Sequence, residues 1–200
     1  MKRKTVVLLL MIVAIGCDDH NDFNLTENNF FPLQVGNYWE FHPFPHPSSD
    51  ETVVKMEITS TQEFSGVEYY LMVRKSEGPY GVYIDTSYYR TNEMGFVFQR
   101  LKTGEFVNPY RLGARDGERW SSSVPANGVD VSVRYIDEPI TVNSTLLANC
   151  RVFAYDKEEW IDEEYWTTLA PGIGIVTSHS AWGFRRDLKR AVINGVEHNF

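Results

Sequence analysis

Residues 52–75 read TVVKMEITSTQEFSGVEYYLMVRK, two runs rich in β-branched and aromatic residues with a Ser-Gly pair between them. These residue types suit the pleated, half-buried surface of a sheet. Ser65-Gly66 is a turn signal, and the two runs stand at hairpin distance from each other. The stretch therefore predicts two strands, Thr52–Phe64 and Val67–Lys75, paired as a β-hairpin.

Similar short runs continue on both sides of this hairpin. Gly36-Asn37 is a turn signal before an alternating strand that starts at Tyr38. Further strands are expected at residues 81–90, 95–101, 105–108, 129–135, 140–145, 150–155, 164–168, 174–180 and 188–193. After the N-terminal apolar run, no segment repeats apolar residues at helical spacing. The sequence predicts an all-β fold, an antiparallel meander that forms a strongly curved sheet or an open barrel, because so many strands seldom stay flat.

The chain begins MKRKTVVLLLMIVAIGCDD, which has the layout of a secretory signal peptide. Basic residues 2–4 precede an apolar run over residues 5–15, which is shorter than the roughly 20 residues that cross a membrane. Residues 14–17, AIGC, resemble the bacterial lipobox, in which the cysteine is acylated and becomes the first residue of the mature protein. The resemblance implies that Cys17 is lipidated. The alternative is a plain secreted protein with a cysteine near the cleavage site by chance.

This reading divides the chain into three parts. Residues 1–16 are the signal peptide, residues 17–29 are the lipidated cysteine and a flexible acidic tether, and residues 30–200 are a single β-rich domain. We expect a lipid-anchored protein of the bacterial cell envelope. The expected place is the outer membrane, on its periplasmic or surface face, in preference to the inner membrane.

The charge of the chain limits its partners. The formal net charge is −8, and cleavage before Cys17 removes three basic residues and leaves −11. Such an acidic surface argues against nucleic acid and against binding anionic lipid headgroups by charge. The expected partners are the membrane, through the lipid on Cys17, and an apolar ligand or an envelope protein. Cys150 would then have no disulfide partner, and a lone cysteine in a strand-like run is usually a small buried hydrophobe.

No local motif of a catalytic, nucleotide-binding or metal site occurs in the sequence. We therefore expect no catalytic residue, no metal and no cofactor. The aromatic residues between positions 69 and 89 offer one binding hypothesis, a tyrosine-rich face that stacks on a sugar or an apolar ligand. Its members would be Tyr69, Tyr80, Tyr83 and Tyr88. Adjacent tyrosines on a strand point to opposite faces, so many of these rings would instead belong to the core.

Three segments resemble a group of uncharacterised bacterial cell-envelope lipoproteins. They are residues 31–41 (FPLQVGNYWEF), 145–152 (TLLANCRV) and 165–176 (YWTTLAPGIGIV). The family shares an opening FPLxxGNxWxY-like strand and a closing turn and strand similar to YWxxxAPGIGxV. The resemblance implies a β-rich envelope domain, and it carries over no catalytic residue.

The residues of these motifs are expected to have structural roles. Pro171-Gly172 has the composition of a tight turn, and Gly174 permits a close approach of neighbouring strands. Trp39 and Trp166 are expected to be buried. The leading functional hypothesis is a non-catalytic envelope lipoprotein that binds an apolar ligand or a protein partner. The alternatives are a surface glycan-binding component that uses the tyrosines, and a hydrolase with an unrecognised pair of carboxylates.

Overall fold

The computed structural model describes residues 29–42, 53–78, 81–101, 103–122, 129–156, 164–181, 183 and 185–200. The proposed signal peptide (residues 1–16), Cys17, nearly all of the tether and Tyr80 lie outside the described residues. All statements below concern the described part of the chain.

Every regular element in the described part is a β-strand, and the strands are antiparallel to their neighbours. Their bounds are β1 Tyr38–Phe41, β2 Val53–Phe64, β3 Val67–Gly78, β4 Gly81–Thr91, β5 Phe96–Arg100, β6 Phe106–Arg111, β7 Arg119–Ser122, β8 Val129–Val142, β9 Thr145–Asp156, β10 Tyr165–Ala170, β11 Gly174–Ser180, β12 Arg185–Ile193 and β13 Val196–Asn199. The predicted all-β class is confirmed. The hairpin at Ser65-Gly66 is present as β2 and β3.

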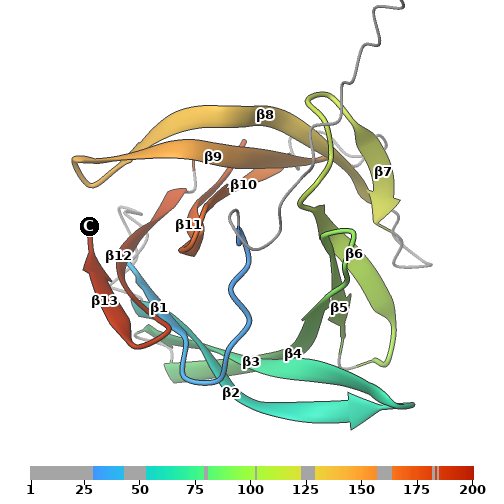
Figure 1. Ribbon diagram of the computed structural model, residues 1–200. Helices are drawn as coiled ribbons and strands as arrows, with labels where there is room; N and C mark the ends of the chain where they lie inside the picture. Colours follow the sequence, from blue (N-terminus) through green and yellow to red (C-terminus); the bar gives the residue numbers. More distant parts are fainter. Residues whose placement is uncertain are drawn as a thin grey trace, which may run out of the picture.

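One sheet contains all thirteen strands, in the order β6-β5-β4-β3-β2-β1-β12-β11-β10-β9-β8-β7, with β13 added at β12. Figure 1 looks along the axis of the resulting ring. The sheet curls until its edge strands β6 and β7 approach each other, and Trp120 Nε1 of β7 donates a hydrogen bond of 2.9 Å to the backbone oxygen of Asn108 in β6. A side chain links these edges and no strand pairing connects them in the described residues, so the sheet is strongly curved and open, as the predicted curved sheet or open barrel requires.

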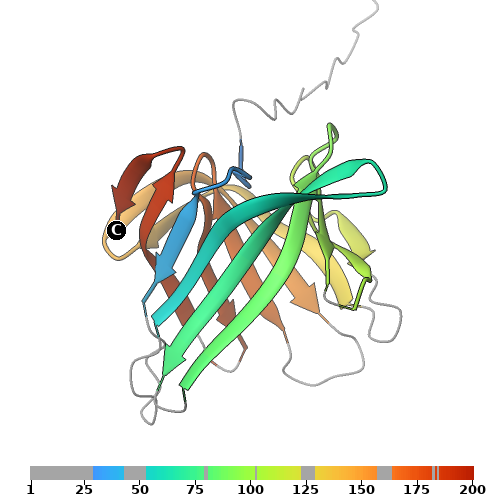
Figure 2. The same ribbon diagram turned by 90° about the horizontal axis from the view of Figure 1, so that it is seen from below.

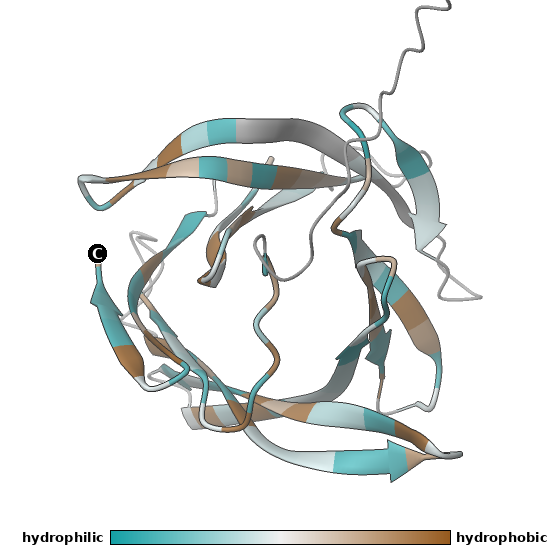
Figure 3. Cartoon of the chain, viewed as in Figure 1, coloured by the Kyte–Doolittle hydropathy of each residue, from teal (hydrophilic) through white to brown (hydrophobic). Residues whose placement is uncertain are grey.

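The largest differences from the prediction concern β7, β8, β9 and β13, and β9 begins at Thr145 and not at Cys150. The runs at 129–135 and 140–145 were expected to be separate strands, but β8 continues from Val129 to Val142 with three register shifts against β9. The four-residue strands β7 and β13 were not predicted, because each is short and directly follows a turn. Polar and apolar residues alternate along strands such as β9 (Figure 3), and such alternation gives a sheet two different faces. Inward positions such as Val54, Ile58 and Met72 are almost fully buried.

The segment before β1 fills one end of the barrel (Figures 1 and 2). Phe30 and Phe31 are 2% and 6% exposed, and the Phe31 ring lies 5.4 Å from Tyr89 and 5.5 Å from Tyr110. The side-chain amide of Asn37 donates to the backbone oxygen of Pro32 at 2.9 Å. The FPL motif therefore works as a plug that closes this end of the interior with aromatic side chains.

The opening and closing motifs lie against each other. Trp39 Nε1 donates a 2.7 Å hydrogen bond to the backbone oxygen of Ile173, and the amide of Gly172 donates to the backbone oxygen of Asn29 at 2.9 Å. The amide of Ile173 closes the turn on Ala170 at 3.2 Å, and Gly172 has a φ of 73°. Pro before a glycine with positive φ is the requirement of a type II turn, so the predicted turn is confirmed.

The two tryptophans of these motifs have different environments. Trp39 is 4% exposed, as expected. Trp166 was also expected to be buried, but it is only half-buried and stacks on His179 with ring centroids 4.8 Å apart. The difference follows from strand alternation, because Trp166 faces away from the side of β10 that carries the neighbouring residue Thr167 into the interior.

Two glycines of the closing motif give a matched pair of substitutions. Both have positive φ, but a Cβ at Gly172 would meet no atom within 4 Å, whereas one at Gly174 would lie 3.3 Å from Pro32 Cδ and from Trp39 Nε1. Strain at positive φ costs about 1–3 kcal/mol, and overpacking adds a similar amount. We expect Gly174→Ala to reduce the free energy of unfolding by about 2–4 kcal/mol and Gly172→Ala by roughly 1 kcal/mol, measured by chemical denaturation. Equal effects would mean that the two motifs do not press on each other at Gly174.

Candidate functional site: a cavity inside the barrel

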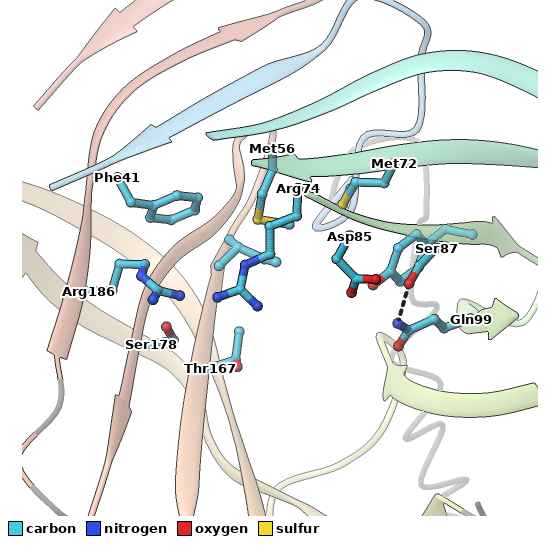
Figure 4. A pocket seen from close by; sticks show the side chains of 12 residues that line it. Phe41, Met56, Met72, Arg74, Asp85, Ser87, Gln99, Thr167, Ser178 and Arg186 are labelled. Atoms are coloured by element: carbon cyan, nitrogen blue, oxygen red, sulfur yellow. Dashed lines mark hydrogen bonds between the residues drawn. The ribbon is translucent and has the colours of Figure 1, made fainter. Parts of the chain in front are cut away.

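The interior that the N-terminal plug leaves unfilled contains a cavity of about 200 Å³. One wall is formed by β2 to β5, and the opposite wall by β10 to β12. Figure 4 shows side chains from both walls pointing into this space. The cavity therefore lies between strands that are far apart in the sequence and are brought together by the curl of the sheet.

Strand register places one polar row on the first wall. Met56 of β2 is opposite Arg74 of β3, and Arg74 is opposite Asp85 of β4. Because paired residues in neighbouring strands share a face, all three side chains project inward. The positive and negative charges of Arg74 and Asp85 are thus direct cross-strand neighbours.

A second row lies on the opposite wall. Thr167 of β10 is paired with Ser178 of β11, and Ser178 is paired with Arg186 of β12. The cross-strand neighbour of Arg186 on this side is therefore a neutral hydroxyl. In Figure 4 the guanidinium groups of Arg74 and Arg186 approach the same part of the cavity from the two walls.

The rest of the lining has an apolar and a neutral polar part. The apolar part consists of Phe41, Met56, Met72 and Ile175. On the polar side, Gln99 Nε2 donates a 3.0 Å hydrogen bond to Ser87 Oγ. The lining also includes Tyr89, and burial raises the pKa of its hydroxyl far above the ordinary value, so that it stays protonated.

Arg186 is the electrostatically unusual group of the cavity. Burial, followed by the positive charge of Arg74, lowers the pKa of Arg186 to about 10, so the guanidinium remains protonated at neutral pH. Its Nε is buried and has no hydrogen-bond partner among the described residues. With Asp85 the only carboxylate among the lining residues that the structure describes, the two arginines give the lining a formal charge of +1. The cavity is positive inside a chain with a net charge of −8.

The cavity is open to solvent at the end of the barrel opposite the plug. Arg74 is exposed, and Asp85 is half-buried. Tyr83, one of the predicted site residues, lies on the same inward row of β4 two residues beyond Asp85 and is 63% exposed. It shares the inward face with Asp85 but is not among the residues that line the cavity. The sequence offered Tyr83 as part of a flat platform and did not indicate the cavity.

Tyr69 and Tyr88 lie on the other face of the sheet. There they join an outer aromatic cluster, defined as Phe64, Tyr69, Tyr88, Arg90, Phe98, Arg100 and Phe106. The Phe64 ring lies 4.9 Å from Tyr88 and 5.6 Å from Tyr69. Three of the four predicted tyrosines are described, and they do not share one face.

The rings of the outer aromatic cluster are covered by arginines. The guanidinium carbon of Arg100 lies 4.3 Å from the centre of the Phe64 ring, and that of Arg90 lies 4.3 Å from the centre of Phe98. Arg90 Nε also donates to the Tyr69 hydroxyl at 3.0 Å, and Tyr69 is only 5% exposed. These contacts stabilise the outer surface of the sheet. Glycan binding by Tyr69, Tyr80, Tyr83 and Tyr88 stays a prediction.

The structure also locates the free cysteine and allows a search for metal-ligand clusters and membrane-spanning helices. Cys150 is fully buried, as expected for a small hydrophobe, and burial raises the pKa of its thiol to about 11. In the part of the chain that the structure describes, no three His, Cys, Asp or Glu residues come together as metal ligands, and no helix has the length and apolar character to cross a membrane.

The fold and the cavity define an open antiparallel β-barrel with a small internal pocket. A solved structure of a "putative exported protein with YmcC-like fold" from Bacteroides fragilis is similar, with a TM-score of 0.50 and 12% identity, over 81% of this chain and 98% of that chain. A "putative lipoprotein" from Parabacteroides distasonis matches with a TM-score of 0.41 and 13% identity, over 80% of this chain and 98% of that chain. Neither a protein-family model nor a curated protein matches the sequence. The first likeness shows a shared fold.

Proposed function

We propose that this protein is a non-catalytic lipoprotein of the bacterial cell envelope that binds a small ligand inside its barrel. The observation that carries the proposal is the cavity of about 200 Å³, which is open at one end and closed by the aromatic plug at the other. Binding pockets are typically concave and largely pre-formed, with an apolar lining and a few convergent polar groups. The two rows of inward side chains match this description.

The size of the cavity restricts the ligand. Pockets for drug-sized molecules usually enclose about 300–1,000 Å³. A volume of about 200 Å³ suits a small molecule or one end of a longer one, and it is too small to enclose a lipid with two acyl chains. The lining favours an amphiphile, because Phe41, Met56, Met72 and Ile175 are apolar and the rest is polar or charged.

The chemistry of the lining supports binding without catalysis. A glycosidase needs two carboxyl groups facing each other, and Asp85 has no second carboxylate among the described lining residues. A serine nucleophile needs an adjacent base, and Ser87 instead receives a hydrogen bond from the neutral amide of Gln99. The signal-peptide layout and the lipobox-like AIGC segment within residues 1–17 support the lipid anchor and the envelope location.

The methionines allow a direct test. Cleavage before Cys17 would leave three methionines, of which Met56 and Met72 line the cavity and Met94 is 64% exposed outside it. In the processed protein in phospholipid nanodiscs, titration with the neutral amphiphile 1-octanol or with octanoate should shift the Met56 and Met72 methyl resonances until they saturate. The Met94 resonance should stay in place. If neither compound shifts Met56 or Met72, the proposed binding function is wrong.

A further inference from the structure

We infer that the ligand of the cavity carries an oxyanion, a carboxylate or a phosphate, and that Arg74 and Arg186 hold it between the two walls of the barrel. The inference rests on the proposed function and names the chemical class of its ligand. It starts from an uncompensated positive charge in the interior.

The first argument concerns what surrounds Arg186. Its cross-strand neighbour Ser178 is neutral, and its Nε is buried without a partner in the described part of the chain. The charged neighbour that acts on it is another cation, Arg74. Burying a charge without an opposite partner costs free energy, and a second positive charge adds to that cost. An anion placed between the two guanidinium groups would remove both costs.

The second argument is a contrast with an arginine on the same strand. Arg185 points outward, and its Nε lies 2.9 Å from the carboxylate of Asp187. Its positive charge is therefore satisfied within the chain. The neighbouring Arg186, one residue further and on the opposite face, has no such carboxylate among the described residues.

The third argument concerns geometry. Guanidinium groups bind carboxylate and phosphate through two parallel N–H···O bonds, and groups on two walls can contact one anion from both sides. The apolar residues Met56 and Ile175 line the same cavity and would cover the carbon chain behind the anionic group. The ligand class is thus a small amphiphile with an anionic head.

Isothermal titration of the processed protein in nanodiscs tests the inference with octanoate, octyl phosphate, 1-octanol, acetate and inorganic phosphate. Octanoate or octyl phosphate should bind at least ten-fold more tightly than 1-octanol, and the tighter of the two identifies the head as carboxylate or phosphate. A ten-fold difference corresponds to about 1.4 kcal/mol. Acetate and inorganic phosphate should bind more weakly than their eight-carbon counterparts. Equal affinity of 1-octanol and both eight-carbon anions would overturn the inference. Equal affinity of the short and the eight-carbon anions would show that the apolar lining does not bind the carbon chain.

Three variants distinguish direct binding of the anion by Arg186 from a nonspecific effect of the protein's positive charge. Arg186→Gln should weaken binding of the anionic amphiphile at least ten-fold. Arg74→Gln should weaken it at least three-fold, because the Arg74 side chain is more exposed and its charge is better screened. Arg185→Gln, the outward neighbour, should leave the affinity unchanged. The affinity for 1-octanol should fall less than the anion affinity in Arg186→Gln and Arg74→Gln, and it should not change in Arg185→Gln. Unchanged anion affinity in Arg186→Gln, or an equal loss in Arg185→Gln, would contradict the inference.

Melting temperatures exclude a purely structural role. Without ligand, Arg186→Gln should melt no earlier than the wild type, since it removes a half-buried positive charge whose Nε has no partner among the described residues. Octanoate at one fixed concentration should raise the melting temperature of the wild type more than that of this variant, because stabilisation by a ligand falls as its affinity falls. Arg186→Lys, which keeps the charge, should bind the anion more tightly than Arg186→Gln does. If octanol binds and these differences are missing, the inference fails and the proposed function stands.

Discussion

Replacement of Trp39 by alanine should reduce the free energy of unfolding by about 3–5 kcal/mol, the usual cost of truncating a buried tryptophan. Trp39 is 4% exposed, donates a hydrogen bond to the backbone oxygen of Ile173 and lies beside Gly174, which is also next to Pro32 of the plug. Its loss would therefore loosen the contact between the two ends of the chain. For a domain of this size, we expect the melting temperature to fall by roughly 6–20 °C in thermal denaturation followed by circular dichroism.

Two further substitutions control for this effect. Trp39→Phe keeps an aromatic ring and removes the Nε1 donor, so it should cost less than Trp39→Ala. Trp166→Ala removes a half-buried ring stacked on His179 and should also cost less. A melting temperature unchanged by Trp39→Ala, or lowered more by Trp166→Ala, would contradict the proposed contact between the motifs.

Replacement of Cys17 by serine should release the protein from the membrane fraction. Serine cannot form the thioether that carries the lipid, and each buried CH₂ of an acyl chain contributes about 0.8 kcal/mol to anchoring. Wild-type protein should stay with membranes after a high-salt wash, and the variant should appear in the soluble fraction or as the unprocessed precursor. Fractionation followed by immunoblotting measures both.

The second cysteine supplies the matched control for the anchor. Cys150 is buried in the barrel, and burial raises the pKa of its thiol, so it is not a site for acylation. Cys150→Ser should therefore leave the folded protein in the membrane fraction. Membrane attachment and normal processing of Cys17→Ser would show that the lipoprotein proposal is wrong.

The sequence predicted the parts of the fold that depend on local chemistry. Strand alternation and the turns at Ser65-Gly66 and Pro171-Gly172 are local signals, and the structure confirms them. The extent of β8 was not predictable, because Pro139 interrupts its pattern and the irregular pairing with β9 accommodates it. The joining of the N-terminal strands to the C-terminal strands in one sheet was also not predictable. It depends on β1 pairing with β12, about 150 positions away, and local periodicity contains no information on such pairings.

The cavity could be predicted only in part. Of the predicted site residues, Tyr83 shares the inward face of β4 with the lining residue Asp85 but does not line the cavity, and Tyr69 and Tyr88 belong to the outer aromatic cluster. Arg74 and Arg186 were missed because they are 112 positions apart and neither belongs to a motif. A weak signal was available, since Arg74 has the same strand parity as Met72, and Arg186 has that of Leu188. A charged residue at an inward position of a strand is unusual and indicates a functional site.

A crystal structure of the intact protein with octanoate decides whether the ligand lies inside the barrel. The proposed function and its extension predict the carboxylate between the guanidinium groups of Arg74 and Arg186, with the carbon chain against Met56. Octanoate bound on the outer aromatic cluster, with an unoccupied cavity, would contradict them.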